Sequence, residues 1–165
     1  MIFKIRFGKW KLTATLAPVV DVVGVNSLLP DGNHILMWDF DDVSEEMVVL
    51  SLIREQLIHD LPPIYELQTR PQVGYIAYCF TRMPFMQACS ISAETHGICR
   101  NFYKWGVFRR RFTLRITPKS DRKPKLVAFL PSSTKEEIDI TELKSFVQYE
   151  TMADGHKGAL IRLGC

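Results

Sequence analysis

The stretch from His34 to Val43 constrains this chain most, because an apolar run ends there in a group of acids. Residues 35–40 are apolar except for Asp39, as in a buried central strand, and an extended chain places alternate side chains on the same face. Asp39 and Asp41 should therefore point the same way. Two carboxylates on one face are hard oxygen ligands that suit Mg²⁺ or Mn²⁺, which can position phosphates for an in-line displacement.

Asp42 is expected to have a different role, because Glu45 follows it at the spacing of a helix N-cap. Its side-chain oxygen would accept an otherwise unpaired backbone N–H at the start of that helix. A simpler interpretation stays open, in which all three acids are only the polar end of a strand and the cap of a helix. The D-x-D pattern alone does not choose between metal binding and this structural role.

The length of 165 residues fits one domain with a sizeable hydrophobic core. With 47% hydrophobic and 24% charged residues, the composition is typical of a folded soluble protein. We expect a single domain over residues 1–165, made of an N-terminal hairpin (1–16), a core (33–152) and a short C-terminal tail (153–165).

The longest apolar stretch, Leu16 to Leu29, is interrupted by Asp21 and Asn26 and is too short to span a bilayer, so no membrane contact is expected. The four histidines are scattered, and no metal site other than an oxygen one is indicated. The cysteines form no C-x-x-C pair, which favours a reduced, intracellular (cytoplasmic) location. They are Cys79, Cys89, Cys99 and Cys165.

Positive charge is concentrated in one segment, Arg100 to Lys125, which holds ten basic residues and one acid. This segment carries +9, and the rest of the chain carries −6. A basic patch beside a carboxylate pair is what a phosphate polyanion with a bound divalent metal requires. The residues assigned to a nucleic-acid-binding surface are Lys104, Arg109, Arg110 and Arg111.

In the first half of the chain, alternating apolar and polar residues predict a β-hairpin over 2–15 with its turn at Gly8-Lys9. Residues 16–33, which contain several Pro and Gly, are expected to be a connecting segment. From Val43 an apolar period of three to four residues predicts an amphipathic helix of about four to five turns. Pro62-Pro63 should end it.

The second half of the chain is expected to alternate strands with shorter helices. Strands are predicted over 64–69, 74–81, 109–117 and 125–130, and helices over 84–94 and 139–152. On the strand 109–117, basic and hydroxyl side chains would share one face. This order predicts an α+β fold, with helices packed on a largely antiparallel mixed sheet.

Taken together, these elements resemble the archaeo-eukaryotic primase superfamily, including the small primase and primase-polymerase domains of plasmids and phages. The resemblance covers roughly residues 34–125. Its first motif is an apolar strand ending in D-x-D, which Met37-Trp38-Asp39-Phe40-Asp41 matches. The second motif is Ser-x-His, and here Ile76 stands at the expected histidine. The third motif supplies another acid, and here Cys99 stands in its place.

This resemblance implies a primase-type, RNA-recognition-motif-like catalytic core and a role in DNA replication. The activity would be metal-dependent nucleotidyl transfer on a single-stranded DNA template, with Asp39 and Asp41 as catalytic residues that bind Mg²⁺ or Mn²⁺. Thr113, Arg115 and Lys119 resemble the basic strand that such domains use near nucleotide phosphates. A replicative helicase would be a further partner.

Several alternatives stay open because Ile76 and Cys99 differ from the residues expected in the second and third motifs. Glu94 or His96 could act in place of the missing groups, or the domain could be a non-catalytic single-stranded nucleic-acid-binding module with the same fold. In the latter case aromatic residues interleaved with the basic segment would stack on bases, although at least half of them are expected to be core. These aromatic residues are Phe102, Tyr103, Trp105, Phe108 and Phe112.

A different enzyme class is also compatible with the acidic stretch. Asp39-Phe40-Asp41-Asp42-Val43 satisfies the D-x-D-x-[TV] pattern of haloacid-dehalogenase phosphatases, in which the first Asp is a nucleophile. Against this, two expected strands precede the stretch and no later pair of acids ends an apolar strand. A covalent phosphate on Asp39 would distinguish this class from a primase.

Overall fold

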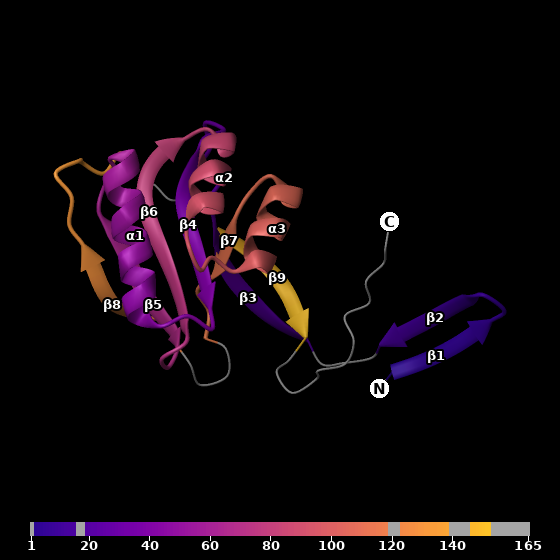
Figure 1. The fold of residues 1–165 in the computed structure, drawn as a ribbon. Helices are drawn as coiled ribbons and strands as arrows, with labels where there is room; N and C mark the ends of the chain where they lie inside the picture. The colour runs from indigo at the N-terminus through magenta and orange to yellow at the C-terminus, as the bar shows by residue number, and fades with distance from the viewer. Residues whose placement is uncertain (1, 16–18, 119–122, 139–145, 153–165) are drawn as a thin grey trace. The chain divides into compact units, whose positions relative to one another are not determined.

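The computed structural model describes residues 2–15, 19–118, 123–138 and 146–152 (Figure 1). The chain divides into two compact units, one of residues 1–22 with 148–165 and the other of residues 23–147. The first unit contains the expected hairpin, in which β1 (Ile2–Phe7) pairs antiparallel with β2 (Trp10–Thr15). Its turn lies at Gly8-Lys9 as predicted, and Gly8 has the positive φ that glycine adopts most easily.

A four-stranded antiparallel sheet forms the centre of the second unit. Its strands are β4 (His34–Asp41), β6 (Gly74–Met83), β5 (Ile64–Arg70) and β8 (Lys125–Leu130), in that spatial order. β6 is buried at nine of its ten positions, as expected for a strand with neighbours on both sides. The strands predicted over 64–69, 74–81 and 125–130 are confirmed, as is the strand that ends in Asp39 and Asp41.

Two helices pack on this sheet, α1 (Glu45–His59) and α2 (Phe85–Glu94) (Figure 1). Val48 and Leu52 of α1 and Ile91 of α2 belong to the same buried core as the apolar residues of β4. The indole Nε1 of Trp38 donates a hydrogen bond of 2.8 Å to Thr95 Oγ1, directly after α2. The α+β fold with antiparallel pairing and helices on the sheet is therefore confirmed. Among the described residues, no helix has both the length and the apolar character needed to cross a membrane.

A second sheet has the strand order β7 (Thr113–Arg115), β3 (Val19–Asn26), β9 (Phe146–Met152). It corrects two expectations. Residues 19–26 form a strand and not a connection, because an apolar run with Val22 and Val25 buried outweighs the single Gly24. Residues 146–152 form a strand and not the end of a helix, so that prediction is wrong there, whereas its start at 139–145 lies outside the described residues.

A third helix, α3 (Arg100–Arg109), was not predicted and shortens the expected strand 109–117 to 113–115. Its C-cap is Arg110, whose φ of 54° is in the left-handed region. Gly106 lies against the ring of Phe112, where an added Cβ would approach ring carbons to 2.2 Å. The helix therefore packs on Phe112 at a position that only glycine allows.

Asp42 does not cap α1. Ser44 holds the N-cap position, and Asp42 is exposed with a φ of 61°. Its backbone N–H donates a hydrogen bond of 2.7 Å to the carbonyl of Val73, which ties the end of β4 to the turn between β5 and β6. The capping prediction is therefore wrong because the chain turns once more before the helix begins.

Candidate functional site

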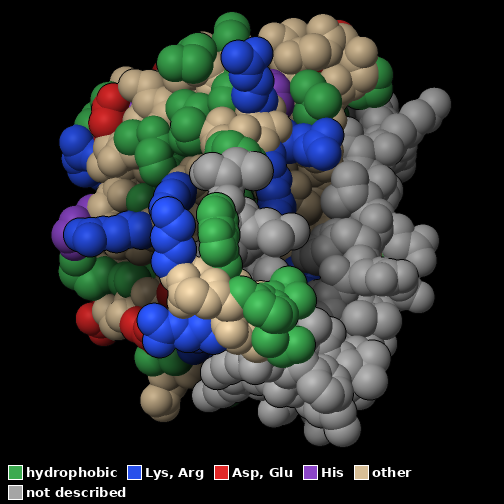
Figure 2. Space-filling view, turned by 90° about the vertical axis from the view of Figure 1, so that its right-hand side faces the viewer, with side chains coloured by type: hydrophobic (Ala, Val, Ile, Leu, Met, Phe, Trp, Pro, Cys, Tyr) green, Lys and Arg blue, Asp and Glu red, His purple; other side chains and the backbone are tan. Residues whose placement is uncertain are grey.

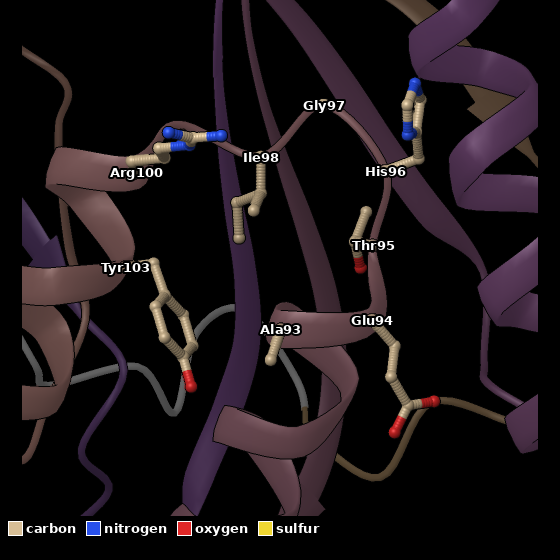
Figure 3. A pocket seen from close by; sticks show the side chains of 8 residues that line it. All are labelled: Ala93, Glu94, Thr95, His96, Gly97, Ile98, Arg100 and Tyr103. Carbon is tan, nitrogen blue, oxygen red and sulfur yellow. The ribbon is translucent and has the colours of Figure 1, made fainter.

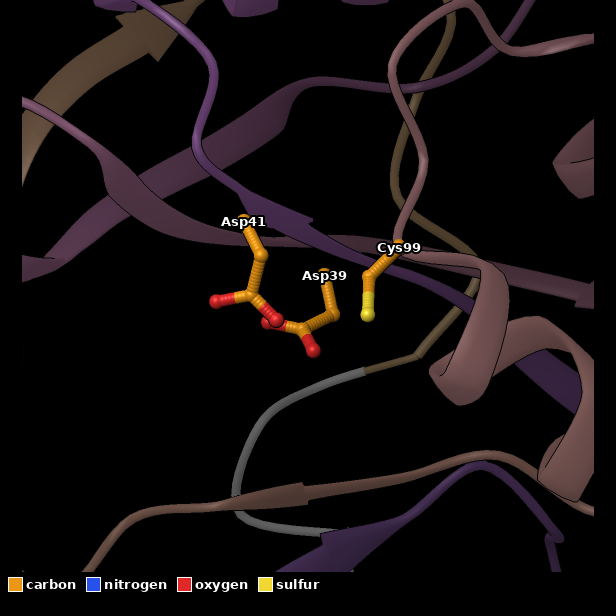
Figure 4. A group of neighbouring side chains, drawn as sticks. All are labelled: Asp39, Asp41 and Cys99. Atoms are coloured by element: carbon orange, nitrogen blue, oxygen red, sulfur yellow. The ribbon is translucent and has the colours of Figure 1, made fainter.

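Asp39 and Asp41 lie on the same face of β4, as the alternation predicts, and Cys99 lies beside them (Figure 4). The ligand atoms of the three side chains are all within 4.8 Å of one another. Figure 4 shows Asp39 between Asp41 and Cys99, with the three side chains directed into the same space. Cys99, the residue at the position where the resemblance to primases predicted an acid, therefore lies next to the Asp39 and Asp41 carboxylates.

Backbone hydrogen bonds hold Cys99 in this place. Its N–H donates a bond of 2.7 Å to the carbonyl of Asp39, and the preceding Ile98 forms an isolated antiparallel bridge with Phe40. The segment between α2 and α3 therefore runs along the outer edge of β4. This arrangement fixes the side chain at position 99 next to Asp39 whatever residue stands there.

The carboxylates of Asp39 and Asp41 together retain a proton near neutral pH. Burial, followed by the negative charge of Asp41, raises the pKa of Asp39 to about 7. Burial also raises the pKa of the Cys99 thiol, which therefore stays protonated. Two carboxylate oxygens fit the hard-ligand preference of Mg²⁺ or Mn²⁺, whereas a thiol is a poor ligand for Mg²⁺. The donor set thus fits one divalent ion with water completing its coordination.

Arg70 is a member of the site that the sequence did not reveal. Its Nη2 lies 2.7 Å from Asp41 Oδ1 and 3.4 Å from Asp42 Oδ1. Arg70 and Asp41 pair with Gly74 from opposite sides, so the guanidinium crosses the central strand where no side chain obstructs it. A Cβ on Gly74 would come within 2.9 Å of Arg70 Nε. An arginine two strands from an acid, with a glycine between them, would have been a signal only once the register was known.

Several of the predicted residues meet in one cavity of about 300 Å³. It combines carboxylates from β4 with side chains from α3 and from the segment that leads into β7. Its lining residues are Asp39, Asp41, Cys99, Asn101, Phe102, Trp105, Gly106, Arg109, Arg111 and Thr113. The carboxylate pair is thus brought together with two of the predicted nucleic-acid-binding arginines and one predicted phosphate-binding residue.

The other predicted residues do not line this cavity. Lys104 and Arg110 are exposed elsewhere on α3 and at its C-cap. The guanidinium of Arg115 donates hydrogen bonds to the carbonyls of Thr117 (3.1 Å) and Pro118 (2.6 Å). Lys119 lies outside the described residues.

Glu94 and His96, the suggested replacements for the missing motif residues, line a different cavity of about 420 Å³ together with Arg100 and Tyr103 (Figure 3). Ile76 is 4% exposed and is the cross-strand partner of Asp39, so its position is next to the carboxylate pair although its side chain is apolar.

The aromatic residues of the basic segment divide as expected between core and surface. Phe112 is buried, and Phe102 and Tyr103 pack against the core, whereas Trp105 and Phe108 are exposed. The Arg109 guanidinium lies 5.4 Å from the centre of the Trp105 ring, a cation–π contact. On the face drawn in Figure 2, Lys and Arg side chains outnumber acidic ones.

No family model, no curated protein and no solved structure matches this chain.

Proposed function

We propose that this protein binds single-stranded nucleic acid and catalyses metal-dependent nucleotidyl transfer of the primase type. The observation that carries the proposal is the shared cavity, which is lined by the acids Asp39 and Asp41 and by the arginines Arg109 and Arg111. A site that reacts with a nucleoside triphosphate needs carboxylates that bind a metal ion. It also needs basic side chains that bind the phosphates.

Each side chain has a defined part in this proposal. Asp39 and Asp41 would hold Mg²⁺ or Mn²⁺, which supplies neutralisation of phosphate charge and lowers the pKa of an attacking hydroxyl. Arg109 and Arg111 would contact phosphates, since guanidinium forks match phosphate oxygens. The exposed Trp105 ring, at 48% exposure, offers a stacking surface for a base. Arg70 holds Asp41 in place and offsets part of the charge of the pair.

A non-catalytic nucleic-acid-binding module is the second candidate, and Cys99 and Ile76 favour it. Both stand beside Asp39, where a third acid and a histidine would strengthen metal and nucleotide binding. With only two carboxylates, a second catalytic ion would lack protein ligands, so weak single-metal activity is the most that this donor set supports.

The test compares Asp39→Asn and Asp41→Asn with Asp42→Asn. Asp42 is the matched control, because it is an adjacent acid that also faces Arg70 but does not line the cavity. Purified variants are incubated with a single-stranded template, labelled nucleotides and Mn²⁺, and incorporation is measured. We expect incorporation by the parent and by Asp42→Asn, and its loss in the other two variants.

The outcomes separate the candidates. Binding of single-stranded DNA without incorporation, in the parent and in Cys99→Asp and Ile76→His variants alike, would replace the enzyme by the binding module. A covalent phosphate on Asp39 after incubation with a phosphate ester would indicate a phosphatase instead.

A further inference from the structure

A second group of potential ligands lies at the C-terminal ends of α1 and α2, outside the cavity of Asp39. It consists of Glu55 and His59, one turn apart on α1, and Glu94, the last residue of α2. One carboxylate oxygen of each glutamate and Nε2 of His59 lie within 4.8 Å of one another. The scattered positions of the histidines in the sequence gave no sign of this group.

The distances within the group suit a tetrahedral metal ion better than hydrogen bonds. His59 Nε2 lies 3.4 Å from Glu55 Oε2 and 3.5 Å from Glu94 Oε2. Ligand atoms bound at ~2.0–2.2 Å to a tetrahedral Zn²⁺ are roughly 3.3–3.6 Å apart. Octahedral Mg²⁺, with bonds of ~2.1 Å, would bring neighbouring ligands to roughly 3.0 Å.

The group also contains buried polar atoms that make no hydrogen bond within the protein. The Glu55 side chain is fully buried, and its Oε2 has no hydrogen-bond partner, nor does the buried Nε2 of His59. A buried carboxylate oxygen without a partner is costly. The two atoms lie 3.4 Å apart, within ion-pair distance, and within 4.8 Å of a carboxylate oxygen of Glu94.

The remaining oxygens are already held by the protein, as is usual for metal-binding carboxylates. Arg54 Nη1 donates to Glu55 Oε1, and Ser90 Oγ donates to Glu94 Oε1 over 3.1 Å. Each carboxylate is thereby oriented with its second oxygen toward His59. Figure 3 shows the Glu94 side chain pointing away from Tyr103.

We propose that Glu55, His59 and Glu94 bind a Zn²⁺-type divalent cation that links α1 to α2. Glu94 is 47% exposed at its side chain and His59 24%, so a water molecule from solvent can complete the tetrahedron. This site is independent of the proposed nucleotidyl transfer, because it shares no residue with the cavity of Asp39.

The test uses the full chain, freed of metal with a chelator, and a background variant with Asp39→Asn, Asp41→Asn and Cys99→Ser. These changes remove the other group of candidate ligands found among the described residues. Co²⁺ is titrated in and its visible absorption recorded, because tetrahedral Co²⁺ absorbs far more strongly than octahedral Co²⁺. Competition with Zn²⁺ then gives the zinc affinity. We expect one equivalent with the tetrahedral spectrum in this background.

Adding His59→Gln or Glu94→Gln should weaken Zn²⁺ binding at least tenfold and remove the tetrahedral spectrum. His96→Gln and Glu46→Gln are matched controls, since both residues are outside the group, and they should bind as the background does. Because Glu94 is partly exposed, its variant should fold even if Glu55→Gln does not. Unchanged zinc affinity in His59→Gln and Glu94→Gln, or no tetrahedral signal in the background, would overturn the proposal.

Discussion

Ile76 on β6 is the direct cross-strand partner of Asp39 on β4. Side chains that face each other in this way have Cβ atoms about 4.5–5.5 Å apart, so a histidine at position 76 would reach the carboxylate pair. Position 76 is the one at which the proposed primase-type function would place a histidine.

We expect Ile76→His to increase Mn²⁺ affinity severalfold and to lower stability, because an imidazole replaces a side chain that is 4% exposed. Isothermal titration with Mn²⁺ and urea unfolding measure the two effects. Ile76→Leu is the control, and it should leave Mn²⁺ affinity unchanged. Equal Mn²⁺ affinity in the histidine and leucine variants would show that position 76 does not face the metal.

The arginines that line the cavity should contribute more to nucleic-acid binding than those that do not. We expect Arg109→Ala with Arg111→Ala to reduce the salt dependence of single-stranded DNA binding, by about 0.7 in log–log slope for each phosphate that the variant no longer neutralises. Lys104→Ala with Arg110→Ala removes the same charge from outside the cavity. Fluorescence anisotropy at several salt concentrations gives both slopes. The same slope for both pairs would mean that only net charge matters.

The guanidinium of Arg115 already donates hydrogen bonds to backbone carbonyls at the end of its own strand. We therefore expect Arg115 to stabilise the fold and not, as the sequence pattern predicted, to bind phosphate. We expect Arg115→Lys to lower the free energy of unfolding by about 1 kcal/mol, because lysine cannot replace both backbone hydrogen bonds of the guanidinium. Nucleotide binding should remain that of the parent. If nucleotide affinity falls while stability is unchanged, Arg115 contacts phosphates as the sequence pattern suggested.

Glu66 makes stability depend on pH. It is fully buried on β5, neither carboxylate oxygen has a hydrogen-bond partner, and burial followed by Glu45 raises its pKa to about 7. The folded state therefore holds a proton that the unfolded chain releases at lower pH, and stability falls as pH rises from about 4 to 7, by at most about 1.4 kcal/mol per pH unit.

We expect Glu66→Gln to reduce this slope, leaving the part that comes from Asp39, whose pKa is also raised to about 7, and to be more stable than the parent at pH 8. Urea unfolding at pH 5 and pH 8 tests this, with the exposed Glu46→Gln as control. A parent whose stability changes over this range in the same way as that of Glu66→Gln would contradict it.

Gly106 should tolerate no side chain. Because an added Cβ would lie 2.2 Å from ring carbons of Phe112, Gly106→Ala must displace α3 or the ring, at an expected cost of about 1–3 kcal/mol. Val107→Ala, at an exposed neighbour, should cost much less. Urea unfolding of both variants provides the comparison, and equal costs would show that α3 does not pack on Phe112.

The elements with a clear period or alternation were predictable from the sequence, and those without one were not. The hairpin, the strand of Asp39 and the pair 64–69 and 74–81 show alternating or continuous apolar runs. The helix α1 was predicted from an apolar period, but Met47, Leu50 and Leu57 of that period are exposed. The buried face of α1 instead holds Val48, Ser51, Leu52 and Glu55. α3 was missed because only Gly106 is buried in it, so no apolar period marks its inner face. In 146–152 the apolar spacing satisfied a helix as well as a strand, and sheet pairing decided between them.

The candidate site was predictable only where neighbours are close in sequence. Asp39 and Asp41 share a face because of strand geometry alone. Arg70 reaches Asp41 only because both strands pair with Gly74, and Glu94 meets His59 only through the packing of two helices. Such contacts depend on register and packing, which a single sequence does not contain.

The bonds that place Cys99 beside Asp39 also protect the outer edge of the four-stranded sheet. β4 is an edge strand of that sheet, and edge strands with free N–H and C=O groups attract strands of other chains. The Asp39 carbonyl is used by the Cys99 N–H, and near the other end of β4 the Ile35 N–H donates to the Ser27 carbonyl over 2.9 Å. The segment between α2 and α3, which places Cys99 in the candidate site, therefore also occupies part of the edge of β4. This hinders the addition of a strand from another molecule and so opposes aggregation.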